Sequence, residues 1–480
     1  MKYGSSWYMP PSLPEILAKT TTSGYIIAPA GFGKTHLIAS SIKLASSRQL
    51  ILTHTYAGVD SLKKKLRNIN VESSLFQVDT IASWALKMCL SYPSNSGWRK
   101  EFPQSSDWND VYKACRKLLN SDFAIRVIKT SYTGIYIDEY QDCSEMQHDL
   151  ILGLVDFLPC RIVGDPLQSI FDFADKPVCW ERDIYPNFLK FGELTIPWRW
   201  RNSGANELGD WLVNIRADIE NEQAPQLPAQ LPKGLELLKI DIHDFTVEPR
   251  KRFASFYKSA SQVGSSIVIF SGNQRSKNKS HKLAQSLSGR FTSIEEVEGK
   301  VLASAVESIE KAKSSANKLI KFFEFLKKCM TGIAGELTAP TKRGEVAKIS
   351  SRTKNKKLTE LSNSFLAHST SDSMLQIVSE FESQAQVQTY RRDLLNRFKG
   401  VLKLHNCGEG AELTDSLELY RQAFRHAGRP LKFNKQIGTT LLVKGLEYDH
   451  CIVINPKEMT SKELYVALTR GSKTLCVIHP

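Results

Sequence analysis

A glycine-rich octet near the start of the chain has the composition of a loop that holds phosphate groups. Glycines let backbone N–H groups approach phosphate oxygens, and a helix that follows adds partial positive charge at its N-terminus. We expect Lys34 to reach the β- and γ-phosphates of a nucleotide and the Thr35 hydroxyl to hold Mg²⁺. An accidental glycine turn is the alternative, because the strict pattern opens with glycine. The candidate nucleotide-binding residues are Ala28, Pro29, Ala30, Gly31, Phe32, Gly33, Lys34 and Thr35.

Two adjacent carboxylates lie about a hundred positions further along the chain. Asp138 and Glu139 directly follow the apolar stretch Gly134-Ile-Tyr-Ile137. Asp138 can hold the Mg²⁺ of a nucleotide, and Glu139 can polarise an attacking water. A surface acidic turn is the alternative interpretation.

The surrounding elements must bring these two groups together. Apolar stretches at residues 25–27, 50–55, 133–138 and 159–165 predict buried strands, and residues 36–45 have apolar positions at helical spacing. Strands and helices in alternation favour a doubly wound α/β sheet. In such a sheet the carboxyl ends of the strands meet at one edge, opposite the phosphate loop.

Length and composition limit the class of protein. The chain has 480 residues, a hydrophobic content of 41% and a net charge of +14. This length predicts more than one domain, and the positive charge favours a polyanionic partner. We find no apolar run of the roughly 20 residues that a membrane span needs, and no apolar signal-peptide core at the N-terminus. We therefore expect no membrane partner.

The cysteines argue against a metal centre. Nine are scattered along the chain, and none forms a Cys-x-x-Cys pair or lies in a histidine cluster. An odd number of scattered cysteines without a signal peptide predicts reduced thiols and a cytoplasmic location.

Six segments in order make the chain resemble the superfamily 1 helicases of the UvrD, Rep and PcrA type. The third segment, Gly164-Asp-Pro-Leu-Gln-Ser-Ile-Phe171, makes this resemblance plain, and Leu464-Tyr-Val-Ala-Leu-Thr-Arg470 closely resembles the final motif of the family. The other matching segments are 28–35, 138–142, 194–203 and 440–449.

The resemblance implies an α/β fold with two RecA-like P-loop motor domains and helical accessory insertions, with ATP and Mg²⁺ as cofactors. The expected first motor domain is formed by residues 1–85 and 133–203, with a small inserted subdomain at 86–132. The expected second motor domain is formed by residues 204–290 and 436–480, with a helical accessory insertion at 291–435.

The same resemblance assigns roles to further residues. Gln168 matches the glutamine that senses the γ-phosphate, and Arg201 and Arg470 match two γ-phosphate arginines, with a surface salt bridge as the alternative for each arginine. Trp200 matches the aromatic residue that stacks on adenine, and Glu447 matches a glutamate that contacts the ribose. We find no counterpart of the upstream glutamine that reads adenine, so we expect only modest discrimination between ATP and GTP.

The resemblance also predicts contacts with single-stranded DNA. Candidate DNA-binding residues are Thr55, Thr80, Trp84, Phe171 and Phe173, and burial in the core is the alternative for the two phenylalanines. Two departures remove DNA-facing groups. Phe173-Ala-Asp replaces a Trp-Arg-Gly, and Leu441 replaces a histidine.

The family implies an ATP-dependent DNA helicase that moves 3′→5′ on single-stranded or tailed DNA. The alternative is a DNA-sensing ATPase subunit of an antiphage nuclease complex, like the UvrD-like proteins of Gabija-like systems, with a nuclease as its partner. A nucleotide-binding protein of unrelated purpose is a third class.

Overall fold

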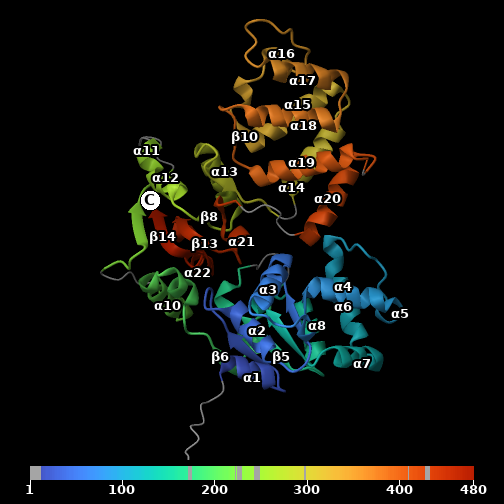
Figure 1. Cartoon of the computed structure of the whole chain (residues 1–480), viewed down its shortest axis with the longest axis vertical. Coiled ribbons are helices and arrows are strands. Elements are labelled where there is room, and N and C mark those ends of the chain that lie inside the picture. Colours follow the sequence, from blue (N-terminus) through green and yellow to red (C-terminus); the bar gives the residue numbers. More distant parts are fainter. Residues whose placement is uncertain are drawn as a thin grey trace, which may run out of the picture. The chain divides into compact units, whose positions relative to one another are not determined.

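The computed structural model describes residues 12–170, 176–221, 223, 230–242, 249–296, 299–408, 410–427 and 433–480. The chain divides into two compact units, residues 1–226 and 227–480. Each unit has its own sheet (Figure 1).

The first unit is built on a parallel sheet with the strand order β3-β2-β4-β5-β1-β6. Its strands are β1 (Gly24–Ile27), β2 (Gln49–Thr53), β3 (Phe76–Thr80), β4 (Gly134–Asp138), β5 (Cys160–Gly164) and β6 (Leu189–Glu193). Its helices are α1 (Leu13–Lys19), α2 (Lys34–Lys43), α3 (Tyr56–Asn68), α4 (Ile81–Ser91), α5 (Pro93–Ser96), α6 (Trp108–Leu118), α7 (Asp122–Ser131), α8 (Glu145–Val155), α9 (Trp198–Ser203) and α10 (Asn206–Glu220).

Alternate residues of these strands serve two hydrophobic cores, one on each face of the sheet. Ile135 and Ile137 of β4 join the core that includes residues of α4, α6 and α8, whereas Tyr136 joins the core on α2 and α3. Successive side chains of a strand point to opposite faces, so a strand buried on both sides is apolar throughout. This is why the short apolar stretches became central strands.

The second unit repeats this arrangement with the strand order β7-β14-β13-β8-β12-β9, also parallel. Its strands are β7 (Leu235–Lys239), β8 (Ser266–Phe270), β9 (Thr292–Ser293), β12 (Lys435–Thr439), β13 (Tyr448–Ile454) and β14 (Gly471–His479). Its remaining elements around this sheet are α11 (Pro249–Arg252), α12 (Ala254–Ser261), α13 (Gln274–Ser286), α21 (Thr440–Val443) and α22 (Ser461–Leu468). Two parallel six-stranded sheets confirm the predicted α/β fold class.

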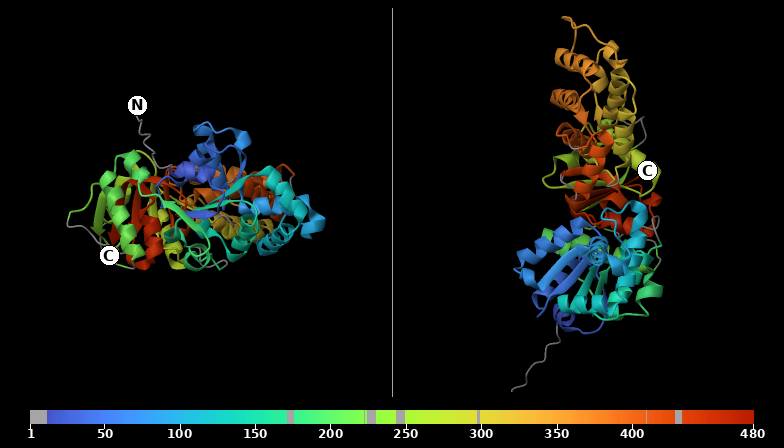
Figure 2. Two further views of the ribbon diagram at one scale, coloured as in Figure 1. Left: turned by 90° about the horizontal axis from the view of Figure 1, so that it is seen from below. Right: turned by 90° about the vertical axis from the view of Figure 1, so that its right-hand side faces the viewer.

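A helical segment interrupts the second sheet between β9 and β12, and it stands apart from the strands in the right-hand view of Figure 2. Its own core is made of aromatic and aliphatic residues, including Phe322, Phe365 and Phe398. The segment contains α14 (Lys300–Glu310), α15 (Ser315–Cys329), α16 (Ala339–Lys342), α17 (Lys356–Ala367), α18 (Ser371–Ser383), α19 (Arg392–Asn406), α20 (Leu413–Ala427) and the short strands β10 (Met330–Thr331) and β11 (Gln388–Thr389).

The boundary between the two compact units lies after residue 226. The first motor domain was expected to end at residue 203, whereas α10 belongs to the first unit. Two contacts tie α10 to the first unit. Gly209 packs so closely against Trp200 that an added Cβ would lie 2.8 Å from Cβ of that tryptophan, and Arg216 pairs with buried Asp165. The finer division into motor and accessory domains stays a prediction.

Candidate nucleotide site and nucleic-acid interface

The loop between β1 and α2 has the backbone that a phosphate site requires. Gly31 and Gly33 have φ values of 81° and 94°, in the left-handed region that glycine adopts without strain. Gly33 is the N-cap of α2 and provides no side-chain cap, so no cap side chain covers the first N–H groups of the helix. Such N-terminal groups and the helix dipole favour an anion.

The two predicted carboxylates lie beside this loop. Lys34 Nζ is 2.5 Å from Glu139 Oε2 and 3.7 Å from Asp138 Oδ1. Glu139 has a φ of 58°, which is uncommon for a residue with a side chain and occurs often at functional sites. Lys34, Asp138 and Glu139 therefore form one charged cluster at the edge of the sheet, as the sequence predicted.

The charges in this cluster perturb one another. Burial disfavours the ammonium of Lys34, but Glu139 and Asp138 outweigh that effect and raise its pKa above the ordinary lysine value. Burial raises the pKa of Asp138 to about 6, against the opposing attraction of Lys34. A nucleotide phosphate could replace the two carboxylates as the partner of Lys34, and a divalent cation could replace Lys34 as the partner of the carboxylates. The cluster already contains the one cation and two carboxylates that these partners need.

Gln168 is connected to the same cluster through hydrogen bonds. Its Nε2 donates to Asp165 Oδ2 over 2.9 Å. The backbone N–H of Asp165 donates to Gln141 Oε1, and Gln141 Nε2 donates to Glu139 Oε2 over 2.6 Å. Gln141 lies within the matching segment 138–142, but the sequence assigned it no role. Its position three residues after Asp138 is the sequence feature that could have identified it as a site residue.

The two tryptophans of the segment that follows β6 have different environments. Trp200 is completely buried, and a Cβ added at Gly31 would lie 2.8 Å from its ring. Trp198 is 48% exposed, and a Cβ added at Gly33 would lie 3.3 Å from its ring. The assignment of Trp200 as the base-stacking residue therefore needs correction, since a ring packed beneath the loop has no free face. The dipeptide Trp-Arg occurs twice, at 198–199 and 200–201, so the expected aromatic-arginine pair can be aligned with either copy.

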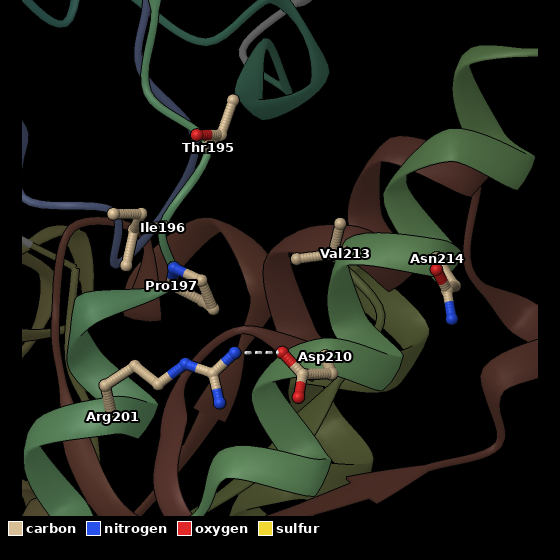
Figure 3. Close-up of a pocket in the computed structure, with 7 residues that line it drawn as sticks. All are labelled: Thr195, Ile196, Pro197, Arg201, Asp210, Val213 and Asn214. Carbon is tan, nitrogen blue, oxygen red and sulfur yellow. Dashed lines mark hydrogen bonds and ion pairs between the residues drawn. The ribbon is translucent and has the colours of Figure 1, made fainter.

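The two arginines of this repeat also differ. The backbone N–H of Arg199 donates to the carbonyl oxygen of Gly31 over 2.9 Å, so Arg199 lies directly against the phosphate loop. Arg201 instead forms an ion pair with Asp210 over 2.5 Å. Figure 3 shows this pair. The two side chains line a cavity with a volume of about 300 Å³. The cavity is lined by Thr195, Ile196, Pro197, Arg201, Asp210, Val213 and Asn214.

In the second unit Arg470 is buried, whereas Glu447 is exposed. Arg470 Nε donates to the carbonyl oxygen of Val466 over 2.8 Å, and its NH1 donates to that of Leu446 over 3.2 Å. Its guanidinium thus joins α22 to the Lys-Gly-Leu-Glu turn. The expected role of Arg470 at a γ-phosphate would require this group to leave those carbonyls.

The candidate DNA-binding threonines begin two helices at the same edge of the first sheet. Thr55 accepts a hydrogen bond from the N–H of Gly58 and is the N-cap of α3, and Thr80 accepts one from Ser83 and is the N-cap of α4. β2 and β3 are parallel neighbours, with Thr53 opposite Thr80, so both helices begin at one edge. This edge presents two helix N-termini, which attract phosphate.

The predicted aromatic contacts with DNA are not supported at Trp84. This residue is only 2% exposed and belongs to the core between the sheet and α4, so it cannot stack on a base in this conformation. Phe171 and Phe173 lie outside the described residues.

Metal and membrane features can be assessed only for the part of the chain that the structure describes. There, no three His, Cys, Asp or Glu side chains gather as metal ligands. No helix in that part has the length and apolar character to cross a membrane. All nine cysteines are free thiols, and eight of them are buried or half-buried.

Comparison with known proteins identifies one segment of the chain. Residues 100–176 match the family model described as "UvrD/REP helicase N-terminal domain", and they include Asp138, Glu139 and Gln168. This match makes the segment UvrD-like. No curated protein sequence matches the chain.

Two solved helicase structures are similar to the chain at low identity. A complex of Arterivirus nonstructural protein 10 (helicase) with DNA is 10% identical, with a TM-score of 0.37, and the match covers 98% of this chain and 63% of that one. The PRRSV helicase is 13% identical, with a TM-score of 0.26, and the match covers 54% of this chain and 42% of that one. In both cases the match covers less than two thirds of the solved chain.

Proposed function

We propose that this UvrD-like chain is an ATP-dependent DNA helicase or translocase that moves 3′→5′ on single-stranded or tailed DNA. The observation that carries the proposal is the contact of Lys34 with Glu139 and Asp138 beside the phosphate loop. A lysine at a helix N-terminus next to two carboxylates can bind the phosphates and assist phosphoryl transfer to water.

Each residue of the cluster has a distinct role in this proposal. Lys34 binds the β- and γ-phosphates, and Glu139 orients and polarises the attacking water. Thr35 and Asp138 would hold Mg²⁺, which shields the phosphate charge when bound, and a hydroxyl with a carboxylate is a donor set that suits this cation. Gln168 would sense the γ-phosphate, and the hydrogen-bond network that it shares with Glu139 supports this role.

Trp198 and Arg199 replace Trp200 and Arg201 in the proposed nucleotide site. Trp198 offers an exposed ring beside Gly33, and Arg199 lies against Gly31. An aromatic face stacks on any purine and does not distinguish adenine from guanine. We therefore expect modest ATP selectivity. Glu447 and Arg470 remain candidates for contacts with the ribose and the γ-phosphate.

The N-terminal ends of α3 and α4 are the proposed contacts with the DNA backbone, and the net charge of +14 favours a polyanion. The fully buried ring of Trp84 favours a second candidate function. In this alternative the chain is a DNA-sensing ATPase that holds DNA too weakly to unwind it alone and acts with a nuclease partner in antiphage defence.

One experiment tests both candidates. ATP hydrolysis by the purified chain is measured without DNA, with single-stranded DNA and with a forked duplex, and strand separation is followed in parallel. The helicase proposal expects stimulation by DNA together with strand separation, and 3′-tailed duplexes should be better substrates than 5′-tailed ones. Stimulation without separation supports the DNA-sensing subunit. Absence of hydrolysis in every condition refutes both.

A further inference from the structure

A buried arginine outside all the sequence motifs contacts the turn that carries Gln168. Arg216 of α10 is 5% exposed, and its NH1 lies 2.7 Å from Oδ1 of fully buried Asp165. Its NH2 lies 2.8 Å from Glu220 Oε1, one helical turn further along α10. The guanidinium is thus held between two carboxylates, and a buried charge pair of this kind depends on such accurate geometry.

Asp165 connects Arg216 to Gln168. Its Oδ2 accepts the Nε2–H of Gln168 over 2.9 Å, and its Oδ1 accepts the backbone N–H of Leu167 over 3.3 Å. The same carboxylate therefore binds Arg216 on one side and orients the 165–168 turn on the other. Both carboxylate oxygens of Asp165 accept hydrogen bonds, and Arg216 supplies one of the donors to Oδ1.

The connection continues to the phosphate loop. The N–H of Asp165 donates to Gln141 Oε1 over 2.9 Å, and Gln141 Nε2 donates to Glu139 Oε2, which pairs with Lys34. Gln141 is 1% exposed, so water does not compete freely for these bonds. An unbroken series of polar contacts within the first unit thus runs from Lys34 to α10.

We propose that Arg216 is a positioning residue for nucleotide hydrolysis. It acts through Asp165 and holds the Gln168 amide in the orientation needed at the γ-phosphate. The inference rests on the proposed ATPase function, and it adds a residue of α10 that touches neither nucleotide nor metal. Loss of Arg216 leaves a buried carboxylate without its cation, so the turn is expected to shift while the phosphate loop remains intact.

The test compares Arg216→Met with Arg161→Met in the full chain. Arg161 is an equally buried arginine near the other end of β5, where it donates to the carbonyl oxygens of Leu17, Pro159 and Thr20. Arg216→Met should lower kcat at least tenfold with KM for ATP within about twofold, and Arg216→Lys should recover most of the loss. Arg161→Met should lower thermal stability without lowering kcat selectively at a nearly constant KM.

A double variant separates positioning from general damage. Gln168→Ala with Arg216→Met should be no slower than Gln168→Ala alone, because both changes remove the same function. If Arg216→Met does not fold, Arg216→Gln is used with the same expectation. The inference fails, while the proposed function stands, if the losses of kcat in the double variant are additive. It also fails if Arg216→Met and Arg161→Met lower kcat equally. A wild-type chain without ATPase activity overturns the proposed function and the inference with it.

Discussion

At the residue scale, the chemistry depends on a lysine that shares its environment with two carboxylates. Lys34 and Glu139 form a 2.5 Å ion pair, and the carboxylates of Glu139 and Asp138 raise the pKa of Lys34 despite its burial. Any phosphate that binds at the loop must compete with Glu139 for the ammonium. We therefore expect substitutions of Lys34 and of Glu139 to have different effects on nucleotide binding and hydrolysis.

Glu139→Gln should keep nucleotide binding and lose hydrolysis, because only the water-polarising carboxylate is changed. General-base catalysis contributes roughly 10²- to 10⁴-fold to a rate, so kcat should fall by at least about a hundredfold. Lys34→Ala should abolish both binding and turnover. Binding of a fluorescent ATP analogue and steady-state hydrolysis measure the two effects. Glu193→Gln on β6 is the control, and near-normal turnover in Glu139→Gln would contradict the assigned role.

Trp198 and Trp200 allow a direct test of which ring meets the base. Trp198→Ala should raise KM for ATP about two- to tenfold with little change in melting temperature, since stacking is worth roughly 0.5–1.5 kcal/mol. Trp200→Ala should lower the free energy of unfolding by about 3–5 kcal/mol, because it empties a buried site. The proposed assignment fails if Trp198→Ala leaves KM unchanged for both ATP and GTP.

At the element scale, the basic stretch that runs from Arg343 after α16 to Lys357 in the first turn of α17 contains two kinds of cation. Lys354 Nζ lies 2.5 Å from the nearly inaccessible carboxylate of Glu336, and Lys357 pairs with buried Glu380 over 3.0 Å. Lys348 and Arg352 are exposed, and their side chains form no ion pair with the described residues. The first two therefore stabilise the helical segment, and the second two are available to a partner.

Charge reversal should separate these roles. Lys348→Glu with Arg352→Glu should leave DNA-free hydrolysis and melting temperature unchanged. If both side chains contact phosphates, duplex binding should weaken and the slope of log K against log salt should fall by about 1.8. Lys354→Glu, the contrasting variant, should lower stability by placing a second carboxylate beside Glu336. An unchanged salt slope in the first variant excludes DNA as the partner of this loop.

At the scale of the whole molecule, the proposed nucleotide site retains more of its expected residues than the proposed DNA track. The first unit brings together Lys34, Asp138, Glu139 and Gln168. By contrast, Trp84 is buried, and Leu441 stands at the position where a histidine was expected. A lost stacking contact costs roughly 1–3 kcal/mol per base. The chain should therefore show DNA-stimulated ATPase activity with weak unwinding.

A single-turnover assay on 3′-tailed duplexes of increasing length measures this balance, with excess competitor DNA to trap released protein. We expect separation of short duplexes and a steep decline with length, because weak contacts allow dissociation between steps. Duplexes with 5′ tails are the control for direction. Efficient separation of long duplexes by the chain alone would contradict the weak-track prediction.

The sequence by itself determined the fold class and the charged cluster. Apolar strands followed directly by Gly-Lys-Thr or Asp-Glu place their polar ends at one sheet edge, since parallel strands share a direction. Local order along the chain is sufficient for this inference. The phosphate loop, Asp138 and Glu139 could accordingly be predicted before the structure.

Only the tertiary structure decided which of several similar residues is buried and which is exposed. Trp198 and Trp200 are each followed by an arginine, but packing against Gly31 buries the ring of Trp200, whereas Trp198 stays half exposed. Arg216 lies 51 positions from Asp165, so no local pattern joins the two. The hydroxyls of Thr55 and Thr80 cap helices, and Trp84 fills a core. These roles depend on burial and on contacts between distant segments, which residue type and spacing do not specify.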